Sequence, residues 1–356
     1  MRNANFYKKL FTNAIVYCTL LVMFLLNYSE AFGQLGDVVI PPVHDPTMIK
    51  QDSVYYVYCT GWGIPIRSST DLVHWKFIGQ VFSKPQEWGV RTLKEFKGRY
   101  VSPDISYHNG TYYLFYCITS YGKNTSAIGV ATNTTLHPDD PNYKWVDHGK
   151  VLESVPNRDN WNAVDPTVVQ DEDGSYWLSF GSFWSGVKIV KLAPDLLRIQ
   201  TEPQVWYPLA RRPRLPGTPD WHSGEAAVEA PFIMRKNDYY YLFVSQDYCC
   251  KGVNSNYKIK VGRSKKLLGP YIDRDGTPLM EGGGTLLLAG DKRWPGRGSN
   301  SVYSENGVDW LVYHAYDARI NGARTLRIRK LLWDEEGWPV AGDVVSAQYE
   351  GAAEGN

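Results

Sequence analysis

Four acidic side chains occupy related places in the sequence and are candidates for joint chemistry. Asp45 and Asp165 each directly precede a proline, and Glu229 lies two residues before one. Asp104 directly follows another proline. A carboxylate at the mouth of an apolar strand either loses its charge or destabilises the fold unless a neighbour compensates it. Carboxyl groups held in contrasting environments can divide the roles of acid and base between them.

The surroundings of three of these acids predict different roles. Glu229 is flanked by valine and alanine, which favours a raised pKa and a general acid that protonates a leaving oxygen. Asp45 follows His44 in a more open, polar stretch and suits an ionised base that activates water. Asp165 would orient the acid and keep it protonated through its own charge. Glycoside hydrolysis requires such a pair of carboxyl groups.

A purely structural role is the alternative for each acid, because aspartates before prolines often form turns. The position of all four acids within one internal repeat favours chemistry instead. Five segments share a hairpin pattern whose anchors are Pro46, Pro103, Pro166, Pro231 and Asn300. The second strand of each hairpin carries an aliphatic residue at Val57, Leu114, Leu178, Leu242 and Leu311. It follows the anchor by 11 residues in four repeats and by 12 in the third, whose DEDG turn is one residue longer.

The length of the repeat predicts an all-β fold, a five-bladed β-propeller with four-stranded blades around a central channel. The anchors are 57, 63, 65 and 69 residues apart, and each interval holds further strand-like runs such as IPIRSSTDLVHWKFIG. No long amphipathic helical period interrupts them. A single catalytic domain is therefore expected over residues 34–356. Its innermost strands follow the channel, so the acids of different repeats should meet at one mouth.

The first 33 residues have the pattern of a secretory signal peptide. A basic start precedes the apolar run AIVYCTLLVMFLL, and small residues end it. The alternative is an uncleaved anchor helix, but the apolar run is short for a bilayer span. We therefore expect an exported protein, secreted or periplasmic, with no stable membrane association after the signal is removed.

Charge and cysteine content exclude some classes of function. The net charge is +1 with 21% charged residues and no long basic run, which argues against a nucleic-acid partner. Of five cysteines, Cys18 lies in the signal, and the others lack metal-site spacing. Cys59 and Cys117 are expected to be small buried side chains, and a bridge between them remains an alternative. The 13 Trp and 25 Tyr fill the core, and a sugar-binding cleft would use some of them.

Several motifs together resemble glycoside hydrolase family 43, and within it most closely the endo-α-1,5-L-arabinanases. They are HDPT at 44–47, VDPTVVQDEDGSYWLSFGSFWSG at 164–186, VEAP at 228–231, DYCCKGVNSNYKIKVGRS at 247–264 and LVYHAYDARINGARTLRIR at 311–329. The resemblance spans essentially the whole chain after the signal, in order. It implies a five-bladed propeller and an inverting mechanism with Asp45 as base, Glu229 as acid and Asp165 as the residue that modulates the acid's pKa.

The resemblance also implies further site residues. Phe183 and Trp184 would line the cleft, and the remaining predicted substrate contacts are Trp62, Asp104 and Asn162. His314 would hold a metal, often calcium, through waters, and a hydrogen-bonded channel histidine is the alternative. One departure is Val101, which stands where many relatives have a tryptophan, so an aromatic stacking surface is missing there.

The expected function is hydrolysis of internal α-1,5-L-arabinofuranosidic bonds of arabinan, without an organic cofactor. An exo-acting α-L-arabinofuranosidase or a β-xylosidase of the same family is the nearest alternative. A non-catalytic carbohydrate-binding propeller would have no reason to keep all three acids. The first motif, HDPT, argues against the related propellers that act on fructosides. The sequence leaves the oligomeric state open.

Overall fold

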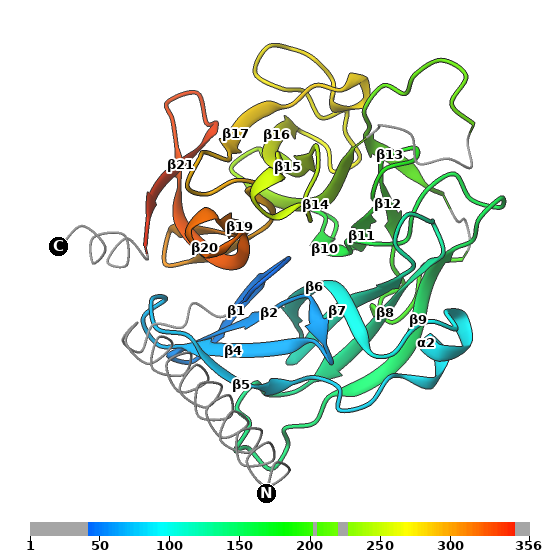
Figure 1. The fold of residues 1–356 in the computed structure, drawn as a ribbon, viewed down its shortest axis with the longest axis vertical. Helices are drawn as coiled ribbons and strands as arrows, with labels where there is room; N and C mark the ends of the chain where they lie inside the picture. Colours follow the sequence, from blue (N-terminus) through cyan, green and yellow to red (C-terminus); the bar gives the residue numbers. More distant parts are fainter. Residues whose placement is uncertain (1–41, 202–204, 220–226, 346–356) are drawn as a thin grey trace, which may run out of the picture. The chain divides into compact units, whose positions relative to one another are not determined.

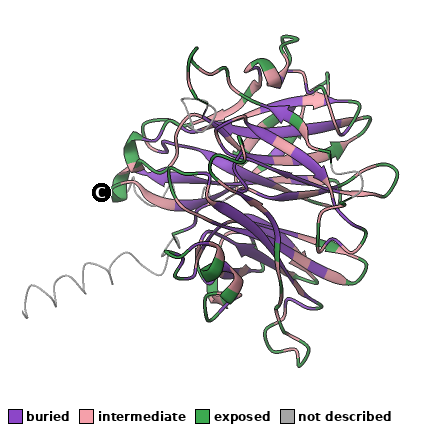
Figure 2. Ribbon diagram, turned by 90° about the vertical axis from the view of Figure 1, so that its right-hand side faces the viewer, coloured by how far each residue is buried: buried purple, intermediate pink, exposed green. Residues whose placement is uncertain are grey.

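The computed structural model describes residues 42–201, 205–219 and 227–345. Five antiparallel sheets surround a central axis, which confirms the predicted five-bladed β-propeller (Figure 1). Buried residues follow the strands and exposed ones gather in the connecting loops (Figure 2). The predicted signal peptide, residues 1–33, lies outside the described residues. No helix within the described ranges is long and apolar enough to cross a membrane.

Each blade is a meander of strands that follow one another in the sequence. The first blade contains β1 (Thr47–Gln51), β2 (Val54–Tyr58), β4 (Pro65–Ser69) and β5 (Lys76–Gln80). The second contains β6 (Arg99–His108), β7 (Thr111–Thr119), β8 (Ser126–Asn133) and β9 (Val146–Ser154), with the short β3 (Gly61–Trp62) paired to β6. The third contains β10 (Thr167–Gln170), β11 (Tyr176–Phe180), β12 (Val187–Lys191) and β13 (Tyr207–Ala210).

The last two blades have the same order. The fourth contains β14 (Val228–Lys236), β15 (Tyr239–Gln246), β16 (Lys258–Ser264) and β17 (Thr285–Ala289). The fifth contains β18 (Gly298–Glu305), β19 (Val308–Asp317), β20 (Ala323–Trp333) and β21 (Pro339–Val344). Short helices lie in connections between strands, at α2 (Glu87–Thr92), η1 (Gly252–Asn254), η2 (Leu279–Glu281) and η3 (Ala318–Ile320).

Strand pairing confirms the predicted repeat register. In every blade the aligned aliphatic residue of the second strand faces the residue two positions after the anchor. These pairs are Met48 with Val57, Ile105 with Leu114, Val168 with Leu178, Ile233 with Leu242 and Val302 with Leu311. All five aliphatic residues have 0% exposure, so the repeat marks the most buried layer of each blade.

The residue directly before each anchor has a left-handed backbone conformation. Asp45, Ser102, Asp165, Ala230 and Ser299 have φ values of 51°, 46°, 57°, 52° and 50°. This conformation is uncommon for residues other than glycine. In the second, fourth and fifth blades it coincides with a register shift in the inner strand pair. Such bulges redirect side chains, and here the redirected residues include Glu229.

A ring of hydrogen bonds joins the blades at these left-handed residues. In four of the five blades, a side chain near the end of the second strand accepts the N–H of the next blade's left-handed residue. Thr60 accepts from Ser102 (2.8 Å), Cys117 from Asp165, Ser245 from Ser299 (2.8 Å) and His314 from Asp45 (3.2 Å). The third blade has Gly181 at this place, and there Asp165 Oδ2 accepts the Ala230 N–H at 3.0 Å. Asp165, one of the candidate catalytic residues, therefore makes the hydrogen bond between the third and fourth blades.

The ring of blades closes where the first blade meets the fifth. β1 lies beside β18, and Pro42 forms a bridge with Thr325 of β20. The Val43 N–H also donates to the Arg324 carbonyl at 3.2 Å. The segment just before the first blade is thus attached to the last blade, which fixes the backbone immediately before His44 and Asp45.

Candidate active site

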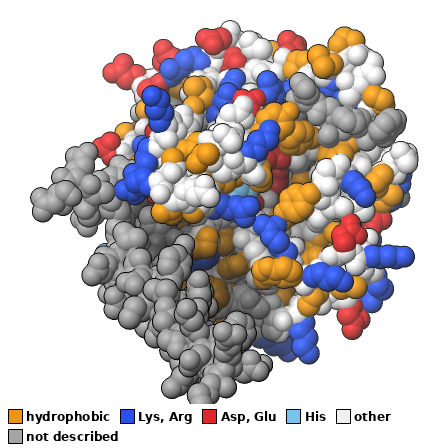
Figure 3. Space-filling model, in the orientation of Figure 1, with side chains coloured by type: hydrophobic (Ala, Val, Ile, Leu, Met, Phe, Trp, Pro, Cys, Tyr) orange, Lys and Arg blue, Asp and Glu red, His pale blue; other side chains and the backbone are white. Residues whose placement is uncertain are grey.

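A cavity of about 570 Å³ opens at one mouth of the channel and receives side chains from all five blades. Asp45, Asp165 and Glu229 all line it, so the three predicted acids converge on one site. Basic and hydrophobic side chains surround the hollow at the centre of this face (Figure 3). The basic members of its lining are His44, Arg99, Lys123 and Arg324.

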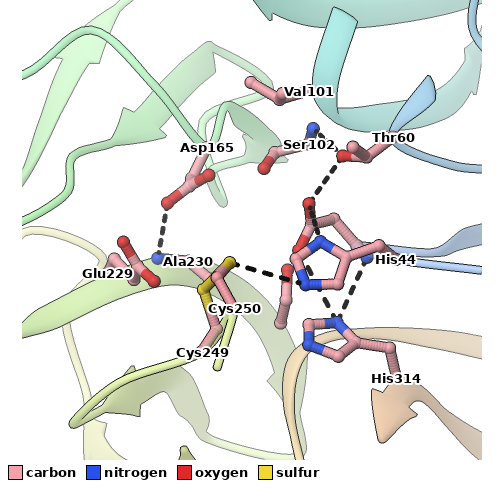
Figure 4. A network of polar contacts seen from close by, with 12 residues as sticks. His44, Thr60, Val101, Ser102, Asp165, Glu229, Ala230, Cys249, Cys250 and His314 are labelled. Atoms are coloured by element: carbon pink, nitrogen blue, oxygen red, sulfur yellow. Dashed lines mark hydrogen bonds and ion pairs between the residues drawn. A yellow bond between two sulfur atoms is a disulfide. The ribbon is translucent and has the colours of Figure 1, made fainter. Parts of the chain in front are cut away.

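Asp45 is fixed by hydrogen bonds with His44 and Thr60, both of which are labelled in Figure 4. His44 Nδ1 lies 2.8 Å from Asp45 Oδ2, and the Thr60 hydroxyl donates to the same oxygen at 2.6 Å. Burial alone would raise the pKa of Asp45, but His44 and Thr60 outweigh it and hold the pKa well below its usual range. The side chain is only 12% exposed, so the ionised state rests on these partners rather than on the open surroundings expected from the sequence.

Glu229 lies at the start of β14 and is held by two hydroxyl groups. Ser182 Oγ donates to Oε2 at 2.6 Å, and the Tyr257 hydroxyl donates to Oε1 at 2.8 Å. Burial raises the pKa of Glu229, and these two hydrogen bonds offset part of the rise. The direction agrees with the general acid that the sequence predicted, because a raised pKa favours the protonated form.

Asp165 occupies the next blade-to-blade joint, beside Glu229 (Figure 4). Burial raises its pKa well above the ordinary value and the charge of Glu229 adds to the rise, while hydrogen bonds from Ser102 and Ala230 oppose it. Burial thus raises the pKa of both neighbouring carboxyl groups, which favours one shared proton over two adjacent negative charges.

Asp104 does not reach the cavity that holds the other three acids. It lies in the narrow channel behind them, in a cavity of about 30 Å³ lined by the anchor residues and their neighbours from all five blades. Its Oδ2 accepts the Val168 N–H at 3.1 Å, and the Thr47 hydroxyl lies 3.4 Å from Oδ1. Burial raises the pKa of Asp104 to about 7. These contacts join three blades and give Asp104 a structural role at a distance from the cavity lining.

His314 is fully buried on β19 beneath the cavity and stacks on His44 with ring centroids 3.9 Å apart. Its Nδ1 accepts the Asp45 N–H, so the ring proton lies on Nε2. Nε2 has no hydrogen-bond partner among the described residues, and neither polar atom of the buried Asn300 amide has one. Unsatisfied polar atoms of this kind call for water or an ion. His314 can thus donate to a water, and Asn300 in the channel offers an oxygen ligand.

The other residues predicted to bind substrate fall into two groups. Phe183, Trp184 and Asn162 line the cavity, as expected. Asn162 is buried and its Oδ1 accepts the Ser126 hydroxyl at 2.6 Å, which fixes its orientation. Trp62 is 58% exposed on β3 and is not part of the cavity lining, although it pairs with Arg99, which is.

Several cavity residues were not predicted from the sequence. Arg99 and the 69% exposed Tyr121 form a hydrogen-bonded pair in the cavity lining. The same lining includes Val101, where the sequence lacks the expected aromatic residue. Tyr257, which binds Glu229, lies directly before β16, and only its place within the motif at 247–264 could have marked it. Ser182 could have been found in the predicted Phe183–Trp184 loop.

The cysteines were only partly anticipated. Cys59 and Cys117 are buried free thiols, as the sequence predicted, and the alternative bridge between them is wrong. The adjacent residues Cys249 and Cys250 form a disulfide that lines the cavity (Figure 4). The sequence showed this pair but gave no reason to expect a bond, because a disulfide between neighbours closes too short a loop to support a fold.

Comparison with known proteins places the chain among carbohydrate-active enzymes. Residues 37–339 match the family described as glycosyl hydrolases family 43. The extracellular exo-α-(1→5)-L-arabinofuranosidase ArbA of Cellvibrio japonicus is 48% identical over 297 residues, which cover 83% of this chain and 85% of that protein. The extracellular endo-α-(1→5)-L-arabinanase 1 of Bacillus subtilis is 41% identical over 301 residues, covering 83% and 87%.

The solved structures agree with the sequence comparison. The α-L-arabinanase of Cellvibrio cellulosa complexed with arabinohexaose superposes with a TM-score of 0.83 at 48% identity, covering 85% of this chain and 95% of that one. The match extends over all five blades and includes the segments that supply the three converging acids. The chain therefore belongs to family 43 of the glycosyl hydrolases.

Proposed function

We propose that this protein hydrolyses α-1,5-linked L-arabinofuranosyl units of arabinan, at bonds within the chain. The observation that supports the proposal best is the convergence on one cavity of Asp45, whose pKa is lowered by His44, and Glu229, whose pKa is raised by burial. The names of the two similar proteins and the arabinohexaose bound in the similar structure point to the same substrate.

The reaction proceeds by a single displacement. Asp45 takes a proton from water, whose oxygen forms a bond to the anomeric carbon. The bond from that carbon to the glycosidic oxygen breaks, and Glu229 transfers its proton to the departing oxygen. Asp165 holds the Ala230 backbone beside Glu229, and its negative charge favours the protonated form of the acid.

An exo-acting enzyme is the second candidate, because the 48% identical relative is named an exo-α-(1→5)-L-arabinofuranosidase. Chromatography of the first products from linear arabinan distinguishes the two modes. Mixed oligosaccharides early in the reaction would support attack within the chain, whereas a single short product from the outset would establish exo action. Failure to release any sugar from linear or branched arabinan would contradict both candidates.

Replacement of the acid tests the mechanism directly. We expect Glu229→Gln to lower kcat on arabinan by about 10²- to 10⁴-fold, the usual contribution of a general acid. The amide keeps both hydroxyl partners, so circular dichroism and the unfolding temperature should match those of the unchanged protein. Exposed Glu87 provides the matched Glu→Gln control. Full activity in a folded Glu229→Gln protein would refute the assignment.

We also propose that a calcium ion, bound below the cavity, is held through waters by His314 and through its amide oxygen by Asn300. The unsatisfied Nε2 and amide oxygen support this arrangement, and calcium prefers oxygen ligands. When bound, the ion would supply positive charge near Asp45. Calcium should raise the unfolding temperature of chelator-treated protein, and Asn300→Ala should lose most of that rise. No calcium-dependent rise in the unchanged protein would overturn the proposal.

Export is the proposed location. Two similar proteins are named extracellular, and the pattern of residues 1–33 supports a signal peptide. A disulfide such as Cys249–Cys250 persists in oxidising compartments outside the cytosol. Amino-terminal sequencing of the protein recovered from the culture medium and from the periplasm would test both the cleavage and the destination.

A further inference from the structure

The Cys249–Cys250 disulfide lies inside the proposed active site. Both cysteines line the cavity that contains the three acids, and Cys250 is exposed to it. Cys250 Sγ lies 3.8 Å from His44 Nε2. Nothing in the acid–base mechanism uses the disulfide, so its position requires another explanation.

A chain of hydrogen bonds leads from the Cys250 backbone to the general base. The Cys250 N–H donates to the Tyr316 hydroxyl oxygen at 2.7 Å. That hydroxyl lies 2.9 Å from His44 Nε2, and His44 Nδ1 lies 2.8 Å from Asp45 Oδ2. Because the first donor is a backbone N–H, the Tyr316 proton is free to point at Nε2. His44 then carries its proton on Nδ1 and donates it to Asp45.

The orientation of the first donor depends on the backbone at Cys250. This residue has φ of 68°, in the left-handed region that residues other than glycine rarely adopt. A bond between adjacent side chains closes a small ring and restricts the backbone between them. The rest of the loop is tied to itself, with the Lys251 N–H donating to Ser255 Oγ at 3.0 Å. The disulfide therefore restrains the one backbone segment that begins the chain of donors.

We propose that the Cys249–Cys250 disulfide and Tyr316 are positioning groups that hold His44, and through it Asp45, in the orientation needed to activate water. This inference rests on the proposed function, since it assigns these groups to the general base of that reaction. Tyr316 and the disulfide act through His44 and are not themselves in the proton transfer.

Reduction of the disulfide gives a direct way to test the proposal in the whole protein. A water-soluble phosphine converts the disulfide and one water to two thiols, and the phosphine takes the oxygen as its oxide. Two thiols that react with iodoacetamide should appear by mass spectrometry, because Cys59 and Cys117 are buried. Reoxidation should reverse the change and serves as the control for damage.

We expect reduction, and separately the double change Cys249→Ala with Cys250→Ala, to lower kcat on arabino-oligosaccharides by about tenfold with little change in KM. A tenfold loss corresponds to the free energy of about one well-placed hydrogen bond. A tenfold rise in KM at unchanged kcat would show that the disulfide only forms part of the binding surface and would overturn the proposal. Unchanged kinetics would also overturn it.

Tyr316→Phe distinguishes an effect through the chain of hydrogen bonds from a general effect on the loop. We expect this variant to show a similar loss of kcat. Reduction should cause no further loss, because the hydrogen bonds from Cys250 and to His44 are already absent. Tyr271→Phe is the matched control, since Tyr271 is buried and its hydroxyl binds the Leu267 carbonyl at 2.7 Å, away from the cavity. Independent, multiplying losses from Tyr316→Phe and reduction would contradict a shared path.

A spectroscopic measurement tests the inference without any substrate. The chain has seven histidines, so the ¹⁵N-labelled imidazole signals can be assigned, with His44 identified by its absence in His44→Gln. The hydrogen-bonded Nδ1–H signal of His44 should be present in the oxidised protein and lost or shifted on reduction. An unchanged signal refutes the inference. A changed signal in a protein that does not cleave arabinan supports the inference and counts against the proposed substrate.

Discussion

The two half-buried carboxyl groups of the third and fourth blades differ in one hydrogen-bond partner. Asp165 accepts hydrogen bonds from the Ser102 side chain and the Ala230 N–H, whereas Glu229 is bound by the hydroxyls of Ser182 and Tyr257. A backbone N–H can only donate a hydrogen bond, whereas a hydroxyl can also accept one from a protonated carboxyl group. Glu229, with two hydroxyl partners, is the carboxyl group that we assign as the proton donor. Removing the charge of Asp165 should move the alkaline limb of the pH–activity profile to lower pH. Removing either hydroxyl partner of Glu229 should move it to higher pH.

We expect Asp165→Asn to move the alkaline limb of activity to lower pH. Activity falls as pH rises through the pKa of Glu229, and removal of the neighbouring negative charge lowers that pKa. The Asn oxygen still accepts the Ala230 N–H, so stability should change little. Asp165→Ala is the comparison, because it leaves that N–H unpaired and should cost about 1–3 kcal/mol in unfolding free energy. An alkaline limb that stays in place in Asp165→Asn would contradict the modulating role.

We expect Tyr257→Phe and Ser182→Ala to move the alkaline limb to higher pH. Each removes a hydrogen bond that holds the pKa of Glu229 down, so the acid keeps its proton to a higher pH. The rate at the optimum should fall by about tenfold or less, as the loss of one hydrogen bond predicts. Half-buried Ser185 in the same loop, whose hydroxyl donates to Asn160 Oδ1 at 3.2 Å, is the control for Ser→Ala. A shift to lower pH would show that these hydroxyls favour the protonated acid.

At the scale of the strands and loops, the sequence predicted the elements that repeat and missed those that do not. The anchors and the aliphatic residues predicted the inner strand pairs, since alternation and turn residues are local signals. Asp45, Asp165 and Glu229 could be placed together because each has a fixed offset within the repeat. Contacts made by irregular loops could not be predicted in this way.

Three residues show why the loop contacts were missed. Tyr121, Tyr257 and Tyr316 are ordinary tyrosines in a chain with 25 of them, and only folding brings their hydroxyls to the site. For Asp104, the repeat led to an expected contact with substrate, whereas the structure places this side chain in the channel. It shares the repeat with the other acids, but its place one residue after the anchor directs it into the channel, where it joins the blades.

The loop after β7 supplies Tyr121 in the region where Val101 leaves the predicted stacking surface incomplete. We expect Tyr121→Ala to raise KM for arabino-oligosaccharides by about two- to tenfold with kcat nearly unchanged, as an aromatic contact of ordinary strength predicts. Tyr107, 53% exposed near the opposite end of the β6–β7 hairpin, is the matched control. Equal effects of the two substitutions, or a loss confined to kcat, would exclude Tyr121 from sugar binding.

For the propeller as a whole, the channel acid Asp104 makes stability depend on pH. Its pKa is raised to about 7 from an ordinary value of 3.8, so the folded protein retains a proton that the unfolded chain releases. Its contribution to the unfolding free energy is therefore greatest below pH 4, falls as pH rises to about 7, and is level above that. The full change is at most about 4 kcal/mol for a shift of this size.

We expect Asp104→Asn to be more stable than the unchanged protein at pH 8 and close to it at pH 4. The amide keeps an oxygen for the Val168 N–H and adds no charge to the channel. Urea unfolding between pH 4 and 8, in the presence of a chelator, measures the difference at each pH. Asp139→Asn at an exposed position is the control. A difference between Asp104→Asn and the unchanged protein that does not vary with pH would mean that Asp104 is ionised throughout.

The missing side chain at Gly181 limits how this scaffold can evolve. Elsewhere in the ring a hydroxyl, a thiol or an imidazole accepts the hydrogen bond from the next blade, so several side-chain types can make this contact. At Gly181 an added Cβ would lie 2.6 Å from the Gly186 carbonyl oxygen, and φ is +130°. No side chain at position 181 can therefore replace the hydrogen bond by which Asp165 joins the third blade to the Ala230 N–H of the fourth. Selection for heat resistance should change the side chains that join the other blades and leave Gly181 and Asp165 unchanged.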